Sequence, residues 1–166
     1  MEWKKSPSEQ DTTSTTRVRV LYADTDRMGV VYHGTYFRWF EASRASFMRR
    51  RGKPYVAIEQ GGLYFPIIEA HAEYLKPARY DEVLDVEAWI PWFRRAQLAF
   101  AYCITRGDDV LVRGYTRHAA VDRKGKPTRL PQNIVKALSR SEIDMAEETR
   151  IRKAVDHAGV RFPLEI

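Results

Sequence analysis

Apolar and polar residues alternate along five segments of the chain, a pattern typical of β-strands with one solvated face. The first segment, residues 17–22, alternates arginine with valine. The other four follow towards the C-terminus, at residues 65–77, 83–93, 96–106 and 109–122. Strands that follow one another this closely normally pair with their sequence neighbours, so we expect an antiparallel sheet.

A different spacing occupies residues 35–51, where aromatic side chains recur at Tyr36, Phe37, Phe40 and Phe47. This spacing predicts a helix with a broad aromatic face, which we expect to lie in the core against the sheet. Gly52 follows directly and is a typical helix stop.

Two shorter helices are expected at residues 54–60 and 131–138. The chain therefore offers one strand, one long helix and then four strands. This order predicts an antiparallel α+β fold.

Residues 22–41 join the first strand to the long helix and hold the candidate chemistry. Two carboxylates, Asp24 and Asp26, precede His33 and the expected helix start. The first turn of a helix leaves its backbone N–H groups unpaired, and the helix dipole makes that end positive. Such an end stabilises an oxygen that becomes negative during a reaction, so the junction predicts an acyl-transfer site.

The same junction carries a long ordered motif, Asp24-Thr-Asp-x-x-Gly-Val-Val-Tyr-His-x-x-Tyr-x-x-Trp-Phe-Glu41. It resembles the signature of the 4-hydroxybenzoyl-CoA thioesterase family of hotdog-fold acyl-CoA thioesterases, and is similar to the Tol-Pal-cluster members. The resemblance is strongest over residues 17–51 and continues more weakly to Leu138. It implies a hotdog fold, in which a curved five-stranded antiparallel sheet wraps around one long helix.

The resemblance also implies an activity, the hydrolysis of an acyl-CoA thioester to a free acid and coenzyme A. No metal or other cofactor is expected, because coenzyme A is part of the substrate. The alternatives are a hotdog hydratase or dehydratase acting on acyl thioesters, and a non-enzymatic protein that binds acyl-CoA or an acidic partner. We expect a homodimer or homotetramer, since hotdog proteins pair their sheets edge to edge and build each site from both chains.

Asp26 matches the motif position of the catalytic carboxylate, and we expect it either to attack the thioester carbonyl or to activate a water molecule. Its alternative role is that of a turn residue that caps the loop. His33 matches the motif too, through its side chain or through a backbone N–H that binds the thioester oxygen. Asp24 is expected to be structural. Glu41, on the long helix, is the second candidate for the catalytic carboxylate.

Four further residues are expected to bind the substrate. Gly29 permits an unusual backbone angle and close approach of the ligand, and Tyr32 either lines the acyl pocket or simply packs. Arg94 and Arg95 lie in a turn beside aromatic residues, where guanidinium groups suit the phosphates of coenzyme A. The histidines in the expected strands lack ligand spacing, so no metal site is expected.

The formal net charge of +6 permits nucleic acid, an anionic membrane or a phosphorylated small molecule as partner. No nucleic-acid module is visible, and no apolar run is long enough to cross a membrane. We expect a cytoplasmic protein with a disordered leader at residues 1–16, a thioesterase domain at 17–138 and a partly helical extension at 139–166. A helix is expected within that extension at 139–157.

Overall fold

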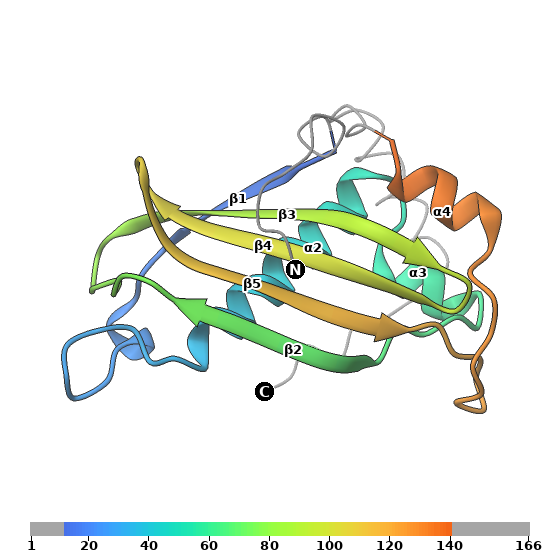
Figure 1. The fold of residues 1–166 in the computed structure, drawn as a ribbon, viewed down its shortest axis with the longest axis horizontal. Helices are drawn as coiled ribbons and strands as arrows, with labels where there is room; N and C mark the ends of the chain where they lie inside the picture. Colours follow the sequence, from blue (N-terminus) through green and yellow to red (C-terminus); the bar gives the residue numbers. More distant parts are fainter. Residues whose placement is uncertain (1–11, 141–166) are drawn as a thin grey trace.

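The computed structural model describes residues 12–140. Its five strands form one antiparallel sheet in the order β1-β3-β4-β5-β2 (Figure 1). They are β1 (Ser14–Arg19), β2 (Ile67–Tyr74), β3 (Val83–Arg94), β4 (Gln97–Arg106) and β5 (Asp109–Ala119). The helical elements are the short 3-10 helix η1 (Tyr22–Asp24), the long α2 (Thr35–Arg50), and the shorter α3 (Tyr55–Gln60) and α4 (Gln132–Leu138).

The long helix α2 lies across one face of the curved sheet, as predicted (Figure 1). Phe40, near its middle, stacks on Tyr102 of β4 with ring centroids 4.3 Å apart. Gly114 of β5 makes room for this ring, because a Cβ atom there would lie 2.5 Å from Phe40 and 2.7 Å from the His71 carbonyl oxygen. The aromatic face of the helix is therefore core, and the predicted five-stranded sheet around one helix is confirmed.

The helix ends where its sequence predicts. Arg51, directly after its last turn, also connects the two ends of the described chain. Gly52 has a φ of +68°, the left-handed conformation of a residue just beyond a helix. Arg51 is buried and donates from Nη1 to Ser14 Oγ at 2.7 Å and from Nε to the Arg140 carbonyl oxygen at 3.0 Å. Its guanidinium also lies 3.5 Å from the centre of the Phe47 ring.

Several boundaries differ from the sequence prediction. The first strand covers 14–19 rather than 17–22, because Ser14 is held by Arg51 and pairs with Ala88. Residues 14–16, which the sequence assigned to the leader, therefore belong to the sheet. Residues 22–24 form η1 instead of strand, since the Asp24 carboxylate accepts the backbone N–H of Leu21 at 2.9 Å. Most of the helix expected at 139–157 lies outside the described residues.

Candidate active site

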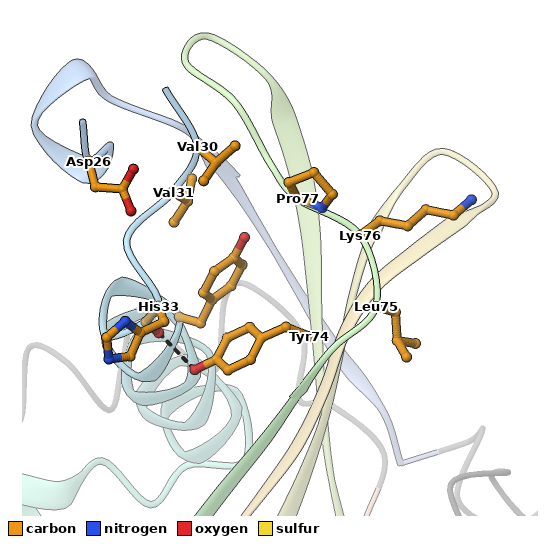
Figure 2. Close-up of a pocket in the computed structure, with 9 residues that line it drawn as sticks. Asp26, Val30, Val31, His33, Tyr74, Leu75, Lys76 and Pro77 are labelled. Atoms are coloured by element: carbon orange, nitrogen blue, oxygen red, sulfur yellow. Dashed lines mark hydrogen bonds between the residues drawn. The ribbon is translucent and has the colours of Figure 1, made fainter. Parts of the chain in front are cut away.

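The loop between η1 and α2 is fixed by its own backbone. Thr25 and Val31 form a β-bridge, and inside it the Asp26 N–H donates to the Val30 carbonyl oxygen at 2.9 Å. The Gly29 N–H closes a turn on the Asp26 carbonyl oxygen at 3.0 Å. Gly29 has a φ of +73°, the conformation for which the sequence predicts glycine here. The loop therefore presents Asp26 in a defined position (Figure 2).

The Asp26 carboxylate has one engaged and one open oxygen. Its Oδ1 accepts the backbone N–H of Met28 at 2.7 Å, which is the Asx-type turn that the sequence left as an alternative. Its Oδ2 has no hydrogen-bond partner within residues 12–140. The turn and a chemical role are thus compatible, because the first oxygen orients the carboxylate while the second stays available.

Asp24 holds the junction together instead of facing a ligand. Only 4% of the residue is exposed, its carboxylate caps the Leu21 N–H, and its Oδ1 lies 3.5 Å from the Arg38 guanidinium. The Asp24 carbonyl oxygen accepts the Tyr32 N–H at 2.9 Å. These contacts agree with the structural role expected for Asp24.

The start of α2 lies beside Asp26 and offers free donors. The backbone N–H groups of His33 and Gly34 have no acceptor in the described part of the chain. The His33 carbonyl oxygen accepts the Tyr74 hydroxyl at 2.9 Å, which holds this turn against the end of β2 (Figure 2). A carbonyl oxygen that becomes negative during acyl transfer is stabilised by such preorganised N–H donors.

A cavity of about 320 Å³ connects these groups. Its walls come from the loop, the helix start and the segment after β2: Asp26, Val30, Val31, His33, Tyr36, Tyr74, Leu75, Lys76 and Pro77. Burial raises the pKa of both Tyr36 and Tyr74, so their hydroxyls remain neutral at physiological pH. The cavity thus brings together a carboxylate, free backbone donors and a mainly apolar wall.

Five of the predicted site residues, Gly29, Tyr32, Glu41, Arg94 and Arg95, do not line this cavity within one chain. Tyr32 is 50% exposed and its ring lies against the His33 ring. Glu41 is exposed on α2, eight residues beyond His33 and so about 12 Å along the helix axis. Arg94 and Arg95 lie at the far end of the sheet, where the Arg94 guanidinium lies 4.6 Å from the centre of the Trp92 ring.

Sequence reasoning missed Tyr74 and Gly34. Tyr74 counted only as the last apolar residue of an alternating strand, and nothing in that pattern shows that its hydroxyl reaches the helix start. Gly34 lies where a Cβ atom would come within 2.7 Å of the Tyr32 ring. A glycine directly before a predicted helix was the available signal for such a close approach.

Within residues 12–140 no group of three His, Cys, Asp or Glu side chains is placed to hold a metal ion. In the same part of the chain, no helix combines the length and the apolar character needed to cross a membrane.

Comparison with known sequences and structures finds relatives of this chain. Residues 28–113 match the model of the thioesterase superfamily. The Escherichia coli acyl-CoA thioester hydrolase YbgC is 33% identical over 120 residues, which are 71% of this chain and 90% of that protein. The crystal structure of the Thermus thermophilus hypothetical protein TT1821 has a TM-score of 0.72 and 38% identity, covering 76% of this chain and 97% of that one.

A further crystal structure, the 1,4-dihydroxy-2-naphthoyl-CoA thioesterase Slr0204 from Synechocystis, has a TM-score of 0.71 and 25% identity. The match covers 76% of this chain and 95% of that one. The family match spans the helix, the second half of the loop and most of the sheet. The chain is therefore a hotdog-fold thioester hydrolase and belongs to the thioesterase superfamily.

Proposed function

We propose that the substrate is an acyl-CoA and that Asp26 carries out the chemistry. The observation that supports this most directly is the free Oδ2 of Asp26 in a cavity that also contains the start of α2. In this arrangement the thioester oxygen binds the N–H groups of His33 and Gly34, and the carbonyl carbon faces the carboxylate. Acyl-CoA hydrolysis by the Escherichia coli relative supports the same substrate class.

Two routes fit these groups. In the first, an Asp26 oxygen attacks the carbonyl carbon, the C–S bond breaks, and coenzyme A leaves as a thiolate that takes a proton from solvent. Water then hydrolyses the resulting mixed anhydride. In the second, Asp26 takes a proton from a water molecule as that water attacks the carbonyl carbon directly. The C–S bond then breaks, and coenzyme A leaves as a thiolate that takes up a proton. Both pass through an oxyanion that the N–H groups stabilise.

The edge strand β2 supports the expected association of two chains. Most of its residues are exposed, and large apolar side chains lie uncovered in or beside it, at Ile67, Ile68, Tyr74 and Leu75. No described strand pairs with its outer edge. An open apolar edge strand is an aggregation hazard unless another strand covers it, so we propose that β2 pairs with β2 of a second copy.

The symmetry of this pair fixes its register closely. Residues directly opposite each other in antiparallel strands point to the same face of the sheet, whereas neighbouring residues along one strand point to opposite faces. A residue of β2 therefore cannot lie opposite its own sequence neighbour in the second copy. The two-fold axis of the pair consequently passes through one residue position of β2, where the two copies of that residue face each other. The central residues are Ala70 and His71. Tyr74 then lies opposite the start of β2 in the partner subunit, between Pro66 and Ile68. The end of the sheet that lies beside the Asp26 cavity in one chain therefore adjoins the opposite end of the sheet in the other chain.

This arrangement gives Arg94 and Arg95 a role that they cannot have within one chain. They lie at the far end of the sheet, three strands from β2, or about 14 Å across the sheet. In the pair, that end lies beside the Asp26 cavity of the other chain. We propose that Arg94 and Arg95 of the partner subunit bind the phosphates of the nucleotide. Gly29 permits close approach of the ligand, and Tyr32 contacts the acyl-CoA at the mouth of the cavity.

Release of free thiol from a panel of aromatic and aliphatic acyl-CoA thioesters tests the proposed function. We expect hydrolysis of at least one member after dialysis against EDTA, since no cofactor is expected. A hydratase or dehydratase would change the acyl chain without releasing coenzyme A, so the same assay separates that alternative. An absence of thiol release across the panel would contradict the proposal. Cytoplasmic location and the exclusion of nucleic acid stay predictions.

A further inference from the structure

The peptide group between His33 and Gly34 lies just outside the hydrogen-bond ladder of α2. The Thr35 N–H donates to the Tyr32 carbonyl oxygen at 2.9 Å, which closes a β-turn with His33 and Gly34 at its centre. The Phe37 N–H donates to the Gly34 carbonyl oxygen at 3.2 Å and not to that of His33. Within the described residues, helical hydrogen bonds therefore fix neither side of this peptide group.

The central peptide group of such a turn can adopt two orientations. A type I turn has a negative φ at its third residue, whereas a flipped central peptide gives a type II turn with a φ of about +80° there. Glycine favours the second form because it adopts a positive φ without steric cost. Gly34, the third residue, has a φ of −68° and a ψ of −24°, which is the type I form. The turn thus holds one orientation although its glycine permits both.

The Tyr74 hydroxyl stabilises the orientation that the structure shows. It donates to the His33 carbonyl oxygen at 2.9 Å, and this is the one hydrogen bond to that oxygen from residues 12–140 (Figure 2). Burial raises the pKa of Tyr74, so the hydroxyl keeps its proton and acts as the donor. A flipped peptide would withdraw the acceptor of this proton, and the hydrogen bond therefore favours the type I form.

The position of Tyr74 is fixed by both the sheet and the helix. It is the last residue of β2, and its backbone pairs with Val112 of β5. Its ring meets the Tyr36 ring of α2 edge-on with centroids 5.4 Å apart, and Tyr36 packs edge-on against Trp39 at 5.2 Å. The Tyr36 hydroxyl also accepts the Ala78 N–H at 3.4 Å. The hydroxyl of Tyr74 is therefore presented to the helix start by a packed cluster of rings.

The orientation of this peptide group decides what a thioester oxygen in the cavity meets. The C=O and N–H of a trans peptide point in opposite directions, so a carbonyl directed at Tyr74 directs the Gly34 N–H away from it. Figure 2 shows Tyr74 and Asp26 on opposite sides of His33. In the flipped turn the His33 carbonyl oxygen would take the place of the N–H and would repel a developing oxyanion.

Resting on the proposed function, we propose that Tyr74 is a positioning residue for hydrolysis, because it holds the turn of residues 32–35 with the Gly34 N–H aimed at the thioester oxygen. Its effect on the reacting carbonyl passes through the peptide group between His33 and Gly34. A hydrogen bond accepted at the carbonyl end of a peptide group also polarises it, which strengthens the N–H at the other end as a donor.

The first test compares kcat and KM of the wild type, Tyr74→Phe and a control, on the acyl-CoA that the wild type hydrolyses best in the panel. Tyr74→Phe keeps the ring and removes the hydroxyl, so kcat should fall by about tenfold to a hundredfold, up to the loss of a whole oxyanion donor. KM should stay near its wild-type value, because the N–H acts on charge that develops in the transition state. The control, Tyr115→Phe, removes a hydroxyl that binds Glu69 on the opposite face of the sheet and should keep the wild-type kcat.

A double-mutant cycle with Gly34→Ala separates this role from simple packing. Alanine disfavours the positive φ of the flipped turn, so the orientation then depends less on the Tyr74 hydroxyl. The new Cβ would lie 2.7 Å from the Tyr32 ring, but that side chain is half exposed, and any cost is common to both arms of the cycle. The loss of kcat caused by Tyr74→Phe should shrink to about threefold or less in the Gly34→Ala background.

The turn can also be observed directly, without substrate. In the flipped form the ψ of His33 is about +120°, which brings its Hα close to the Gly34 N–H. The nuclear Overhauser effect between these two protons should therefore be weak in the wild type and stronger in Tyr74→Phe. This measurement needs no change at Gly34, so the inference stays testable if Gly34→Ala does not fold.

Three results would overturn the inference. The first is a Tyr74→Phe variant that keeps the wild-type kcat or loses activity only through KM. The second is an equal loss of kcat with and without Gly34→Ala, which would assign Tyr74 to packing. The third is a nuclear Overhauser effect that Tyr74→Phe leaves unchanged. None of these affects the proposed function, which fails only if the wild type releases no coenzyme A from any thioester.

Discussion

Acidification should destabilise this fold through one residue, His118 of β5. The side chain is fully buried. Burial, together with the nearby Arg44 cation, lowers the pKa of His118 to about 4 from its ordinary value of 6.5. The unfolded chain therefore takes up a proton on this residue at a higher pH than the native chain. Stability contributed by neutral His118 is complete above pH 6.5 and is lost as the pH falls towards 4.

The expected loss follows from the two pKa values. As the pH falls from 7.5 to 4.5, the unfolded chain binds up to nearly one more proton at His118 than the native chain, with the largest difference between the two pKa values. Each pKa unit of difference corresponds to about 1.4 kcal/mol. The free energy of unfolding should thus fall by about 2 to 3 kcal/mol over this range. The salt-bridged carboxylates Asp85 and Asp109, whose pKa values are lowered, lose their contribution only below this interval.

Urea unfolding followed by tryptophan fluorescence, at pH 7.5, 6.0 and 4.5 and fixed protein concentration, measures this loss. In His118→Gln the histidine titration is absent, so the free energy of unfolding should change little over the same range, although its value at pH 7.5 should be lower. His33→Gln, which removes an exposed histidine, should keep the wild-type dependence. A wild-type stability that stays flat down to pH 4.5, or a His118→Gln variant with the same slope, would refute the reasoning.

Three further predictions follow from the packing, the charges and the edge strand. Gly114→Ala places a Cβ atom 2.5 Å from the Phe40 ring, so the urea midpoint should fall by an amount equivalent to about 1–3 kcal/mol; an unchanged midpoint would contradict the close packing. Replacing Arg94 and Arg95 with alanine should raise KM for acyl-CoA more than it lowers kcat, because phosphate contacts hold substrate and transition state alike. An equal loss of activity on acyl-CoA and on pantetheine thioesters would show that the two arginines do not bind the nucleotide. Light scattering should give a dimer or tetramer for the wild type, and Ala70→Pro should weaken this association by removing an edge N–H; an active wild-type monomer would contradict the shared site.

The periodic elements could be predicted because they depend on local chemistry. The aromatic stripe of α2 and the stop at Gly52 are visible in the residues themselves, and both are confirmed. The first strand was placed too late because its start depends on Arg51, thirty-seven residues away in the sequence. An alternating pattern contains no information about such a distant partner.

The residues of the candidate site were likewise only partly predictable from the sequence. The motif identified Asp26 and His33, which the structure places in the wall of one cavity. It gave no indication of Tyr74, whose hydroxyl reaches His33 from 41 residues away. Contacts between segments that are distant in the sequence can be identified only from the folded structure.

The most direct test of the account is kcat for acyl-CoA hydrolysis by Asp26→Asn. The amide oxygen of asparagine can still accept the Met28 N–H, so the loop should keep its conformation while the negative charge is lost. We expect kcat to fall at least about a hundredfold, the low end of what a positioned base contributes. Asp24→Asn should reduce kcat less, and Glu41→Gln should remain active. An Asp26→Asn variant near the wild-type rate, beside an inactive Glu41→Gln, would show that the helix carboxylate carries out the chemistry instead.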